Sequence, residues 1–476
     1  MVYKNNLYFD VQSASREVTG NCTYLTIPFP NKTEKRILID AGLFQEKEYL
    51  ELNKSFGFNP ENIDYVFITH NHTDHTGRIP LLYKLGYKHM VFCTNKTHKV
   101  LPIALNDTTS ILYNDAKLKK EKPLYDIADT QKALNSIVSY PNNELFRLDN
   151  NISFMFIPNA HIYGAASIFL KIKYPGEKTI NLLFTGDYAK ENMLFNTEEI
   201  PSWIFDTSPI TFQECTYGNT NSLDTVHVFK ENIVKACKEG KCILLPAFSL
   251  GRYQEAMYLI NLYKKMGIIP QNYPVYLDGV MPLKYNGIIL HDETLKKDVK
   301  EILSAYPFTV VTPENRGYIM QPFGKKIVIA SSGMMTNGWS YEYMKNWLCY
   351  DNVLIHLLGY MAEGTFGRKL LEIKKGDILE LLDGQKVLKL AQVEHTSELS
   401  AHAKQDELLE YLKPFPTINA HFSMHGNNDV REIYSSKVAT KINPKSTFNL
   451  RPDTIYRLDG YGFRKSIPLT NYAIVR

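Results

Sequence analysis

The chain has 476 residues, 44% of them hydrophobic, and its 54 Lys and Arg against 50 Asp and Glu give a net charge of +4. At roughly 150 residues per domain, this length predicts two or three domains with a large buried core, and the composition excludes bulk disorder. The mild positive charge permits a polyanionic partner without indicating one.

No stretch of about 20 apolar residues is present, so we expect no membrane span. Residues 1–6 lack the apolar run of a signal peptide. The six cysteines are scattered, and no two of them form a Cys-x-x-Cys pair. This spacing argues against a disulfide framework and a thiolate zinc site and is typical of a reducing compartment, so we expect a cytoplasmic protein.

Short apolar runs that end in a polar residue recur in the first part of the chain, at residues 37–39, 65–69, 182–186 and 210–213. They are too short for helices and rich in β-branched and aromatic residues, which predicts buried strands. The residues that follow them are Asp40, His70, Asp187 and Glu214. Layered α/β proteins place ligands at the carboxyl ends of strands, so each run delivers a candidate functional group.

From about residue 242 the pattern changes to alternating strands and helices, which predicts a doubly wound α/β unit. We expect a helix over residues 252–265 and strands at 242–246, 274–277, 327–330 and 353–355. Histidine-bearing segments return after about residue 390. The simplest account is an α/β domain made of residues 1–208 and 391–476, interrupted by an inserted domain at 209–390.

A basic segment contains Lys117, Lys119, Lys120 and Lys122. It fits a solvated helix face, and it also fits a contact with nucleic acid. The sequence leaves both interpretations open.

The sharpest chemical signal is the run His70-Asn71-His72-Thr73-Asp74-His75, directly after a predicted strand. Imidazoles and carboxylates this close together carry a heavy desolvation cost when they are buried without partners. A divalent metal supplies the partner, because neutral imidazole suits Zn²⁺ and a carboxylate adds compensating charge. Side chains that alternate along the loop can point to two centres, so two adjacent metal sites are plausible.

Further candidates lie downstream, where His161 is part of Asn159-Ala160-His161 and Asp187 closes Phe184-Thr185-Gly186-Asp187. A single histidine or a strand-end aspartate is usually structural. These two are candidates for metal ligands only because they occur together with the first motif. For Asp40, the role of orienting a ligating histidine fits better than the role of a metal ligand, since ligating histidines need their other ring nitrogen held.

In this combination the sequence resembles the metallo-β-lactamase superfamily and, within it, the β-CASP nucleases. Asp40 matches the family's first motif, His161 its third and Asp187 its fourth. Glu214, His402 and His425 stand where the family has its motifs A, B and C, within Gln213-Glu214-Cys215-Thr216, Ser400-Ala401-His402-Ala403 and Met424-His425-Gly426. Family-like segments also include residues 15–20, 246–252, 331–334 and 359–365, so the resemblance covers nearly the whole chain. It implies an αββα sandwich with an inserted doubly wound α/β domain.

The resemblance implies a pair of metal ions, two Zn²⁺ with Mn²⁺ as the alternative. One ion would be held by His70, His72 and His161. The other would be held by Asp74, His75 and His425, and Asp187 would bridge the two. Such a pair can hold a hydroxide nucleophile and clamp a scissile phosphate.

The catalytic residues implied by the resemblance are Asp74, His402 and Glu214. His402 would protonate the leaving oxygen, and Glu214 would accept a hydrogen bond from the other nitrogen of that ring. Both residues also have a structural interpretation. His402 would then cap the helix expected at 404–412, and Glu214 would form a surface salt bridge. Ser331, Ser332 and Gly333 end a predicted strand, where they would either grip a phosphate or form a plain tight turn.

The implied substrate is RNA, single-stranded, because RNA-acting members of the family have histidine at the position of His425, whereas Artemis-type DNA nucleases have valine. A homodimer is an open possibility. Alternatives are a DNA nuclease of the same family, a non-catalytic RNA-binding scaffold, and a hydrolase of a small ester or lactone. The sequence does not separate endonuclease from 5′-exonuclease action.

Three positions depart from the family's pattern. The Asp that usually follows Ser-Ala-His-Ala is Lys404, the Glu that usually follows His-Gly is Asn427, and an Asp-Ser-Pro is replaced by Asp278-Gly279-Val280. None of these changes removes a predicted ligand or His402, so they bear on substrate choice and turnover.

Overall fold

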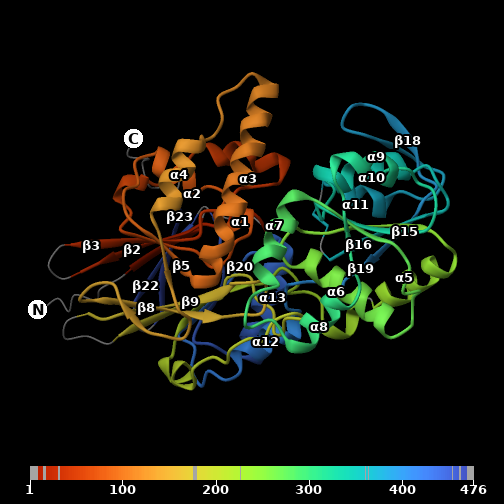
Figure 1. Ribbon diagram of the computed structural model, residues 1–476. Coiled ribbons are helices and arrows are strands. Elements are labelled where there is room, and N and C mark those ends of the chain that lie inside the picture. Colours follow the sequence, from red (N-terminus) through yellow and green to blue (C-terminus); the bar gives the residue numbers. More distant parts are fainter. Residues whose placement is uncertain are drawn as a thin grey trace, which may run out of the picture. The chain divides into compact units, whose positions relative to one another are not determined.

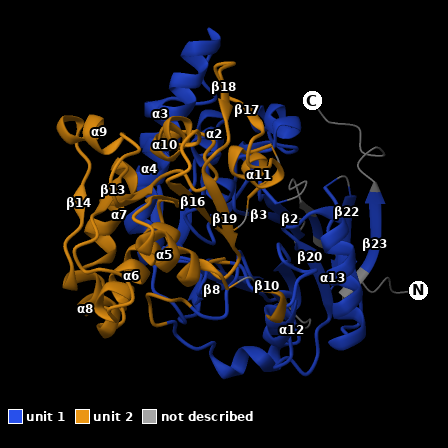
Figure 2. Ribbon diagram, turned by 90° about the vertical axis from the view of Figure 1, so that its right-hand side faces the viewer, with its two compact units in different colours: residues 1–191, 197–222, 402–476 blue, residues 192–196, 223–401 orange. Residues whose placement is uncertain are grey.

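The computed structural model describes residues 9–13, 18–29, 33–174, 179–225, 227–359, 361–362, 364–452, 454–459 and 462–468. Residues 1–6, and residues 15–17, 360 and 363 of the family-like segments, lie outside these ranges. The chain divides into two compact units, unit 1 (residues 1–191, 197–222 and 402–476) and unit 2 (residues 192–196 and 223–401) (Figure 2). The predicted boundaries at 208/209 and 390/391 stay predictions. No helix in the described ranges is long and apolar enough to cross a membrane.

Unit 1 is built on two mixed β-sheets. The first sheet has the order β23-β22-β1-β2-β3-β4-β5-β6, with β1 (Phe9–Ser13), β2 (Thr23–Pro28), β3 (Glu34–Ile39), β4 (Tyr65–Phe67), β5 (Val91–Thr94), β6 (Ile137–Tyr140), β22 (Thr454–Asp459) and β23 (Gly462–Pro468). The second has the order β21-β20-β11-β10-β9-β8-β7, with β7 (Phe146–Arg147), β8 (Ile152–Pro158), β9 (Ala166–Ile172), β10 (Ile180–Phe184), β11 (Ile210–Glu214), β20 (Ala420–Met424) and β21 (Thr447–Asn449).

The main core of unit 1 lies between these sheets, where apolar residues such as Leu25 and Phe67 of the first sheet pack against Phe154 and Phe212 of the second. The outer faces are covered by helices (Figure 1). The first sheet carries α2 (Ile79–Lys84), α3 (Asn95–Lys119) and α4 (Ile127–Asn135), and the second carries α12 (Gln405–Leu412) and α13 (Asn428–Lys441). Unit 1 is therefore a four-layer αββα sandwich.

Unit 2 contains a parallel sheet in the order β14-β13-β15-β12-β16-β19. Its strands are β12 (Cys242–Pro246), β13 (Val275–Asp278), β14 (Thr309–Val310), β15 (Lys326–Ala330), β16 (Val353–Leu358) and β19 (Gln392–Thr396). Its helices are α5 (Phe229–Lys238), α6 (Arg252–Lys265), α7 (Val280–Ile289), α8 (Lys297–Ala305), α9 (Pro313–Ile319), α10 (Gly338–Trp347) and α11 (Phe366–Glu372). Alternate strand residues serve opposite faces, so Leu244 and Val328 pack on α10 and α11 while Ile243 and Ile329 face the side of α5 and α6.

The remaining regular elements are short. They are the hairpin of β17 (Ile378–Glu380) and β18 (Lys386–Leu388), the helix α1 (Thr73–Thr76), and the 3₁₀ helices η1 (Lys47–Lys54), η2 (Pro60–Asn62), η3 (Ser202–Thr207) and η4 (Ser222–Asp224).

The fold class predicted from the sequence is confirmed, since an αββα sandwich is interrupted by a doubly wound α/β insertion. The predicted runs form β3, β4, β10, β11, β12, β13, β15 and β16, and the helix expected at 252–265 is α6. The lysines of residues 117–122 are exposed at the end of α3 and just beyond it. Exposure suits both interpretations of that segment.

Strand direction brings the polar residues together. In the first sheet β3 runs parallel to β4, and in the second β10, β11 and β20 are mutually parallel. Parallel strands have their carboxyl ends at one edge of the sheet, so the residues after them share that edge. Asp40, the loop that starts at His70, Asp187 and His425 all follow such ends.

A buried arginine fastens the loop after β3 to the start of α2. Arg78 is 1% exposed, and its Nε donates to the carbonyl of Gly42 at 2.5 Å, while Nη1 donates to the carbonyls of Leu52 and Ser55 at 3.2 Å. The guanidinium also lies over aromatic rings, Phe44 at 5.0 Å and Phe56 at 4.6 Å. A charged fork with these donors satisfies carbonyls that an apolar side chain would leave unpaired.

We therefore expect Arg78→Met to lower the free energy of unfolding of unit 1 by about 2–4 kcal/mol, because three backbone carbonyls, one of them buried, lose a charged donor. Urea denaturation followed by tryptophan fluorescence measures the change. Arg147→Met, at an exposed arginine of β7, is the matched control and should cost less than about 1 kcal/mol. Equal losses in the two variants would contradict a special role for Arg78.

Candidate metal centre

The structure brings the predicted ligands into two neighbouring groups in unit 1. One contains His70, His72, His161 and Asp187, and the other contains Asp74, His75, Asp187 and His425. In each group the candidate ligand atoms lie within 4.8 Å of one another. The residues come from the loop after β4, helix α1, the β8–β9 loop, and the ends of β10 and β20.

The first group is a cluster of three imidazoles and one carboxylate oxygen. His72 Nδ1 lies 3.1 Å from the Nε2 atoms of both His70 and His161. Oδ2 of Asp187 lies 3.5 Å from the same two Nε2 atoms. Three ring nitrogens and one oxygen therefore converge from different segments on a single point.

The second group uses the other oxygen of the same aspartate. Asp187 Oδ1 lies 3.1 Å from Nε2 of His75 and 3.2 Å from Nε2 of His425, and these two nitrogens are 3.2 Å apart. Oδ2 of Asp74 completes the group at 3.8 Å from His75 Nε2 and 3.6 Å from His425 Nε2.

These distances fit metal ligation. In a tetrahedral site with metal–ligand bonds of about 2.0–2.1 Å, neighbouring ligand atoms are about 3.3 Å apart. Within the described part of the chain, the buried Oδ1 of Asp187 makes no hydrogen bond, although two imidazole nitrogens approach it. A buried carboxylate oxygen without a donor is costly unless a cation meets it. The residues present therefore fit a pair of metal ions bridged by Asp187.

Burial and charge prepare the two groups for cations. Burial lowers the pKa of His70, and it lowers that of His72 to about 4, which keeps both rings in the neutral form that binds metals. Burial also opposes a charged His75, but the carboxylates of Asp187 and Asp40 outweigh it and raise the pKa of that ring. The surroundings of His75 thus favour a positive charge, which a divalent cation supplies.

The far nitrogens of three ligand rings, His70, His75 and His425, lie against oxygen atoms. Nδ1 of His75 donates to Asp40 Oδ2 at 2.7 Å, and Asp40 in turn accepts from the backbone and hydroxyl of Thr69, each at 2.8 Å. Nδ1 of His70 lies 3.1 Å from the Thr69 hydroxyl, and Nδ1 of His425 lies 3.0 Å from that of Thr216. These contacts direct Nε2 of each ring toward the ligand group, as expected for oriented metal ligands.

Close backbone approaches allow this geometry. Gly186, just before Asp187, has a φ of +58°, and a Cβ there would lie 2.7 Å from Cβ of Thr69. At Gly42, a Cβ would lie 1.5 Å from the backbone oxygen of Asp74. Glycine at both positions lets segments distant in sequence meet around the cluster.

His402 and Glu214 stand beside the metal ligands. Nδ1 of His402 donates to Oε1 of Glu214 at 2.9 Å, and Nε2 of the same ring lies 3.9 Å from Oδ2 of Asp187. Burial lowers the pKa of His402, but the carboxylates of Glu214, Asp187 and Asp74 together more than offset this and raise it above the usual value. Glu214 is also fixed by the backbone N–H groups of Tyr188 and Thr216, at 2.8 and 3.0 Å. His402 is thus held in one orientation, with its outer nitrogen toward the cluster.

Sequence reasoning missed several residues of this site. Thr69, Thr216 and Asn21 place polar atoms within 3.3 Å of the Nδ1 atoms of the ligand histidines. Thr69 stands directly before the first histidine of the motif, which is the one local signal that could have indicated it. The other two approach only through the fold.

The predicted phosphate-contact residues lie in unit 2. Ser331, Ser332 and Gly333 follow β15, and the Ser332 hydroxyl donates to the carbonyl of Asn337 at 3.1 Å. Their assignment to substrate binding stays a prediction.

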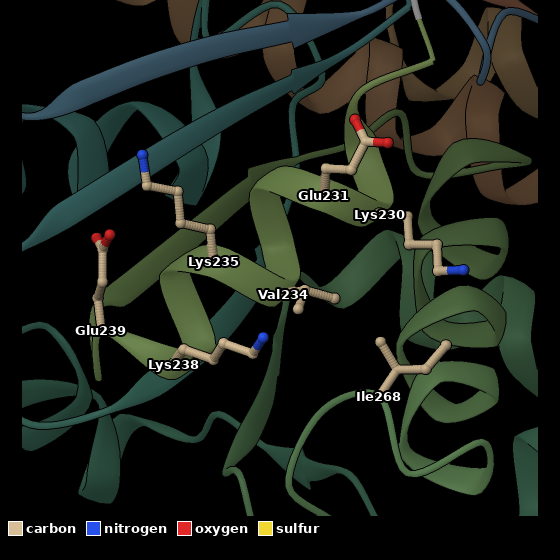
Figure 3. A pocket seen from close by; sticks show the side chains of 7 residues that line it. All are labelled: Lys230, Glu231, Val234, Lys235, Lys238, Glu239 and Ile268. Carbon is tan, nitrogen blue, oxygen red and sulfur yellow. The ribbon is translucent and has the colours of Figure 1, made fainter.

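A separate depression in unit 2 runs along α5 and is lined by Lys230, Glu231, Val234, Lys235, Lys238, Glu239 and Ile268 (Figure 3). Its ammonium and carboxylate groups come mostly from one helix and point in different directions. Opposite charges in such an open place do not concentrate the potential needed for a specific ionic ligand.

Comparison with known proteins agrees with this geometry. A family model described as the metallo-beta-lactamase superfamily matches residues 16–208, and one described as the Beta-Casp domain matches residues 253–370. Transcription termination factor FttA of Methanosarcina mazei is 29% identical over 450 residues, which are 90% of this chain and 68% of that protein. A ribonuclease of Thermus thermophilus is 28% identical over 420 residues, or 85% of this chain and 90% of the relative. An Integrator complex subunit 11 homolog of Dictyostelium discoideum is 25% identical over 450 residues, or 89% of this chain and 58% of the relative.

The shared position of Asp187 predicts how metal content responds to substitution. The wild-type protein should bind two equivalents of Zn²⁺ or Mn²⁺, His161→Ala should lose one, and Asp187→Ala should lose both, since its two oxygens serve both groups. Elemental analysis after equilibrium dialysis measures the stoichiometry. His98→Ala, a histidine of α3 outside both groups, is the control. Retention of two metals by Asp187→Ala would contradict the shared ligand.

Asp40→Asn tests the orienting contact. Asp40 uses both carboxylate oxygens as acceptors, one for the Thr69 N–H and one for the Thr69 hydroxyl and the His75 ring. An amide has only one acceptor oxygen, so the substitution removes one of these acceptors and loosens the orientation of the imidazole. We expect about 10- to 100-fold weaker metal affinity, measured by competition with a chromogenic chelator. Circular dichroism should confirm that the variant is folded, and unchanged affinity would show that Asp40 does not orient the ring.

Proposed function

Because the chain belongs to the β-CASP family of the metallo-β-lactamase superfamily, we propose that it is a metal-dependent ribonuclease that hydrolyses phosphodiester bonds of single-stranded RNA. The observation that carries the proposal is Asp187, whose two oxygens each meet a separate group of imidazoles. A pair of divalent ions bound there would supply a nucleophilic hydroxide near neutral pH and neutralise charge on the phosphate.

The protein's own groups have distinct tasks in this reaction. His70, His72 and His161 would hold one ion, Asp74, His75 and His425 the other, and Asp187 both. His402 would donate a proton from Nε2 to the leaving oxygen. Glu214 keeps the proton-bearing ring oriented through its bond to Nδ1.

RNA is favoured over other substrates by the relatives and by His425. The Thermus thermophilus relative is named a ribonuclease, and a Methanocaldococcus jannaschii relative, 28% identical over 416 residues, is named a probable RNase. Histidine rather than valine at position 425 matches the RNA-acting members that the sequence resembles. A non-catalytic scaffold is disfavoured because every predicted ligand position carries a ligating residue.

We propose Zn²⁺ as the native metal, with Mn²⁺ as the alternative. The first group offers imidazole nitrogens, which suit Zn²⁺. The second group adds the Asp74 carboxylate, a harder ligand that also suits Mn²⁺. Titration of the metal-free protein with each ion, followed by activity at matched occupancy, separates the two.

The test of the function is cleavage of oligonucleotides of defined sequence. The wild-type protein should cut single-stranded RNA bearing a 5′-monophosphate or 5′-triphosphate, and mapping every product end reports whether the mode is endo- or exonucleolytic. His402→Ala should lower kcat about 10²- to 10⁴-fold, the usual contribution of a general acid, without changing metal content.

Controls separate this proposal from its alternatives. DNA of the same sequence and a panel of small esters are assayed in parallel, and His98→Ala should cleave RNA at the parental rate. Preference for DNA or esters would overturn the substrate assignment. A well-folded, metal-loaded His402→Ala variant with full activity would overturn the proton-donor assignment.

A further inference from the structure

Lys404 occupies an unusual place beside the site. It stands where the family that the sequence resembles has Asp, and it is the N-cap residue of α12. The positive end of the helix dipole disfavours a cation there. The lysine is nevertheless only 5% exposed, and burial lowers its pKa to about 8, so the side chain stays mostly charged near pH 7.

Its ammonium is held by an aromatic ring. Lys404 Nζ lies 3.4 Å from the centroid of the Tyr217 ring, and within the described ranges this nitrogen makes no hydrogen bond. A desolvated cation over the face of an aromatic ring is stabilised by the ring quadrupole. The lysine therefore fixes the orientation of Tyr217 and covers one of its faces.

The backbone around Tyr217 is also fixed. Tyr217 and Lys404 form an isolated β-bridge, and the backbone N–H of Gln405 donates to the carbonyl of Thr220 at 2.8 Å. The Gln405 side chain donates to the carbonyl of Gly218 at 2.5 Å. The ring thus projects from a loop that is already ordered, so little conformational entropy is lost when a ligand contacts the ring.

Tyr217 lies next to the reacting groups. Its ring centroid is 6.3 Å from that of His402, and the residue is three positions after Glu214. The Tyr217 side chain remains partly exposed, whereas Lys404 is buried. Single-stranded nucleic acids are commonly held by bases that stack on such rings.

We propose that Tyr217 is the stacking platform for a nucleobase next to the scissile phosphate, and that Lys404 is a positioning residue that holds this ring. The inference rests on the proposed ribonuclease function and names the contact that places the strand beside His402. Stacking does not read base identity, so the platform would accept purines and pyrimidines.

The first experiment compares variants on an RNA whose cleavage site has been mapped. Tyr217→Leu should raise KM about 5- to 150-fold, the effect of losing one base–aromatic stack, with kcat unchanged because substrate and transition state are bound equally. Tyr217→Phe should keep the parental KM. Lys404→Met should raise KM without lowering the unfolding temperature, because it removes a buried charge while loosening the ring.

The second experiment replaces single nucleotides beside the mapped site by abasic ones. One abasic position should weaken wild-type binding as much as Tyr217→Leu does, and the two changes together should be no worse than either alone. Binding is measured without turnover, by fluorescence anisotropy of RNA carrying a methylenephosphonate at the scissile linkage. Tyr113→Leu on α3 and Lys296→Met at the N-cap of α8 are the matched controls.

The outcomes separate this inference from the proposed function. If the wild-type protein cleaves RNA but abasic positions and Tyr217→Leu have additive or no effects on Kd, the platform is refuted and the ribonuclease stands. If the wild-type protein neither binds nor cleaves RNA, both fall. A KM raised equally by Tyr217→Phe and Tyr217→Leu would assign the effect to the hydroxyl and overturn stacking.

Discussion

The structure of the site depends on one buried carboxylate that faces two ways. Asp187 presents Oδ2 to His70 and His161, and Oδ1 to His75 and His425. An ionised carboxylate at 1% exposure is tolerable only where positive charge or donors meet both oxygens. The parallel strands, Gly186 and the loop after β4 together place this group where two cations would meet that need. The remaining ligands complete the shells on either side.

The ligands could be predicted from the sequence because their signal is local. Four of them fall within residues 70–75, and a strand signal precedes that motif and also Asp187, which makes a shared sheet edge the natural expectation. The orienting role of Asp40 followed from a general rule on ligating histidines, and its 2.7 Å bond to His75 agrees with it. Thr216 and Asn21 were out of reach, because their short side chains matter only once segments far apart in sequence are packed. Tyr217 and Lys404 illustrate the same limit, since nothing in the sequence around either residue predicts their contact.

The departures from the family's pattern acquire different meanings in the structure. Asp278 keeps the Asp of the Asp-Ser-Pro pattern, while Gly279 and Val280 replace the other two residues. Asp278 is fully buried and bound by Arg316 and Tyr343, so its carboxylate serves the packing of unit 2. Asn427 is the N-cap residue of α13 and follows the ligand His425 by two positions. Lys404 stands at the corresponding place before α12, two residues after His402. Two acidic family positions beside the site have thus become a neutral residue and a cation.

This change of charge bears on which substrates the site can hold. Two divalent ions would contribute four positive charges, which the carboxylates of Asp74, Asp187 and Asp40 and a bound hydroxide would balance when the ligand imidazoles are neutral. The net charge beside the site therefore depends on its other groups, and Lys404 in place of an acid shifts it toward the sign that attracts a polyanion. Charges beside a site mainly govern the association of a charged ligand, whereas the ligands of the metal ions would govern the chemistry. Under the proposed function, binding of the strand and cleavage of its backbone would therefore fall to different side chains of unit 1, and each could be altered while the other is kept.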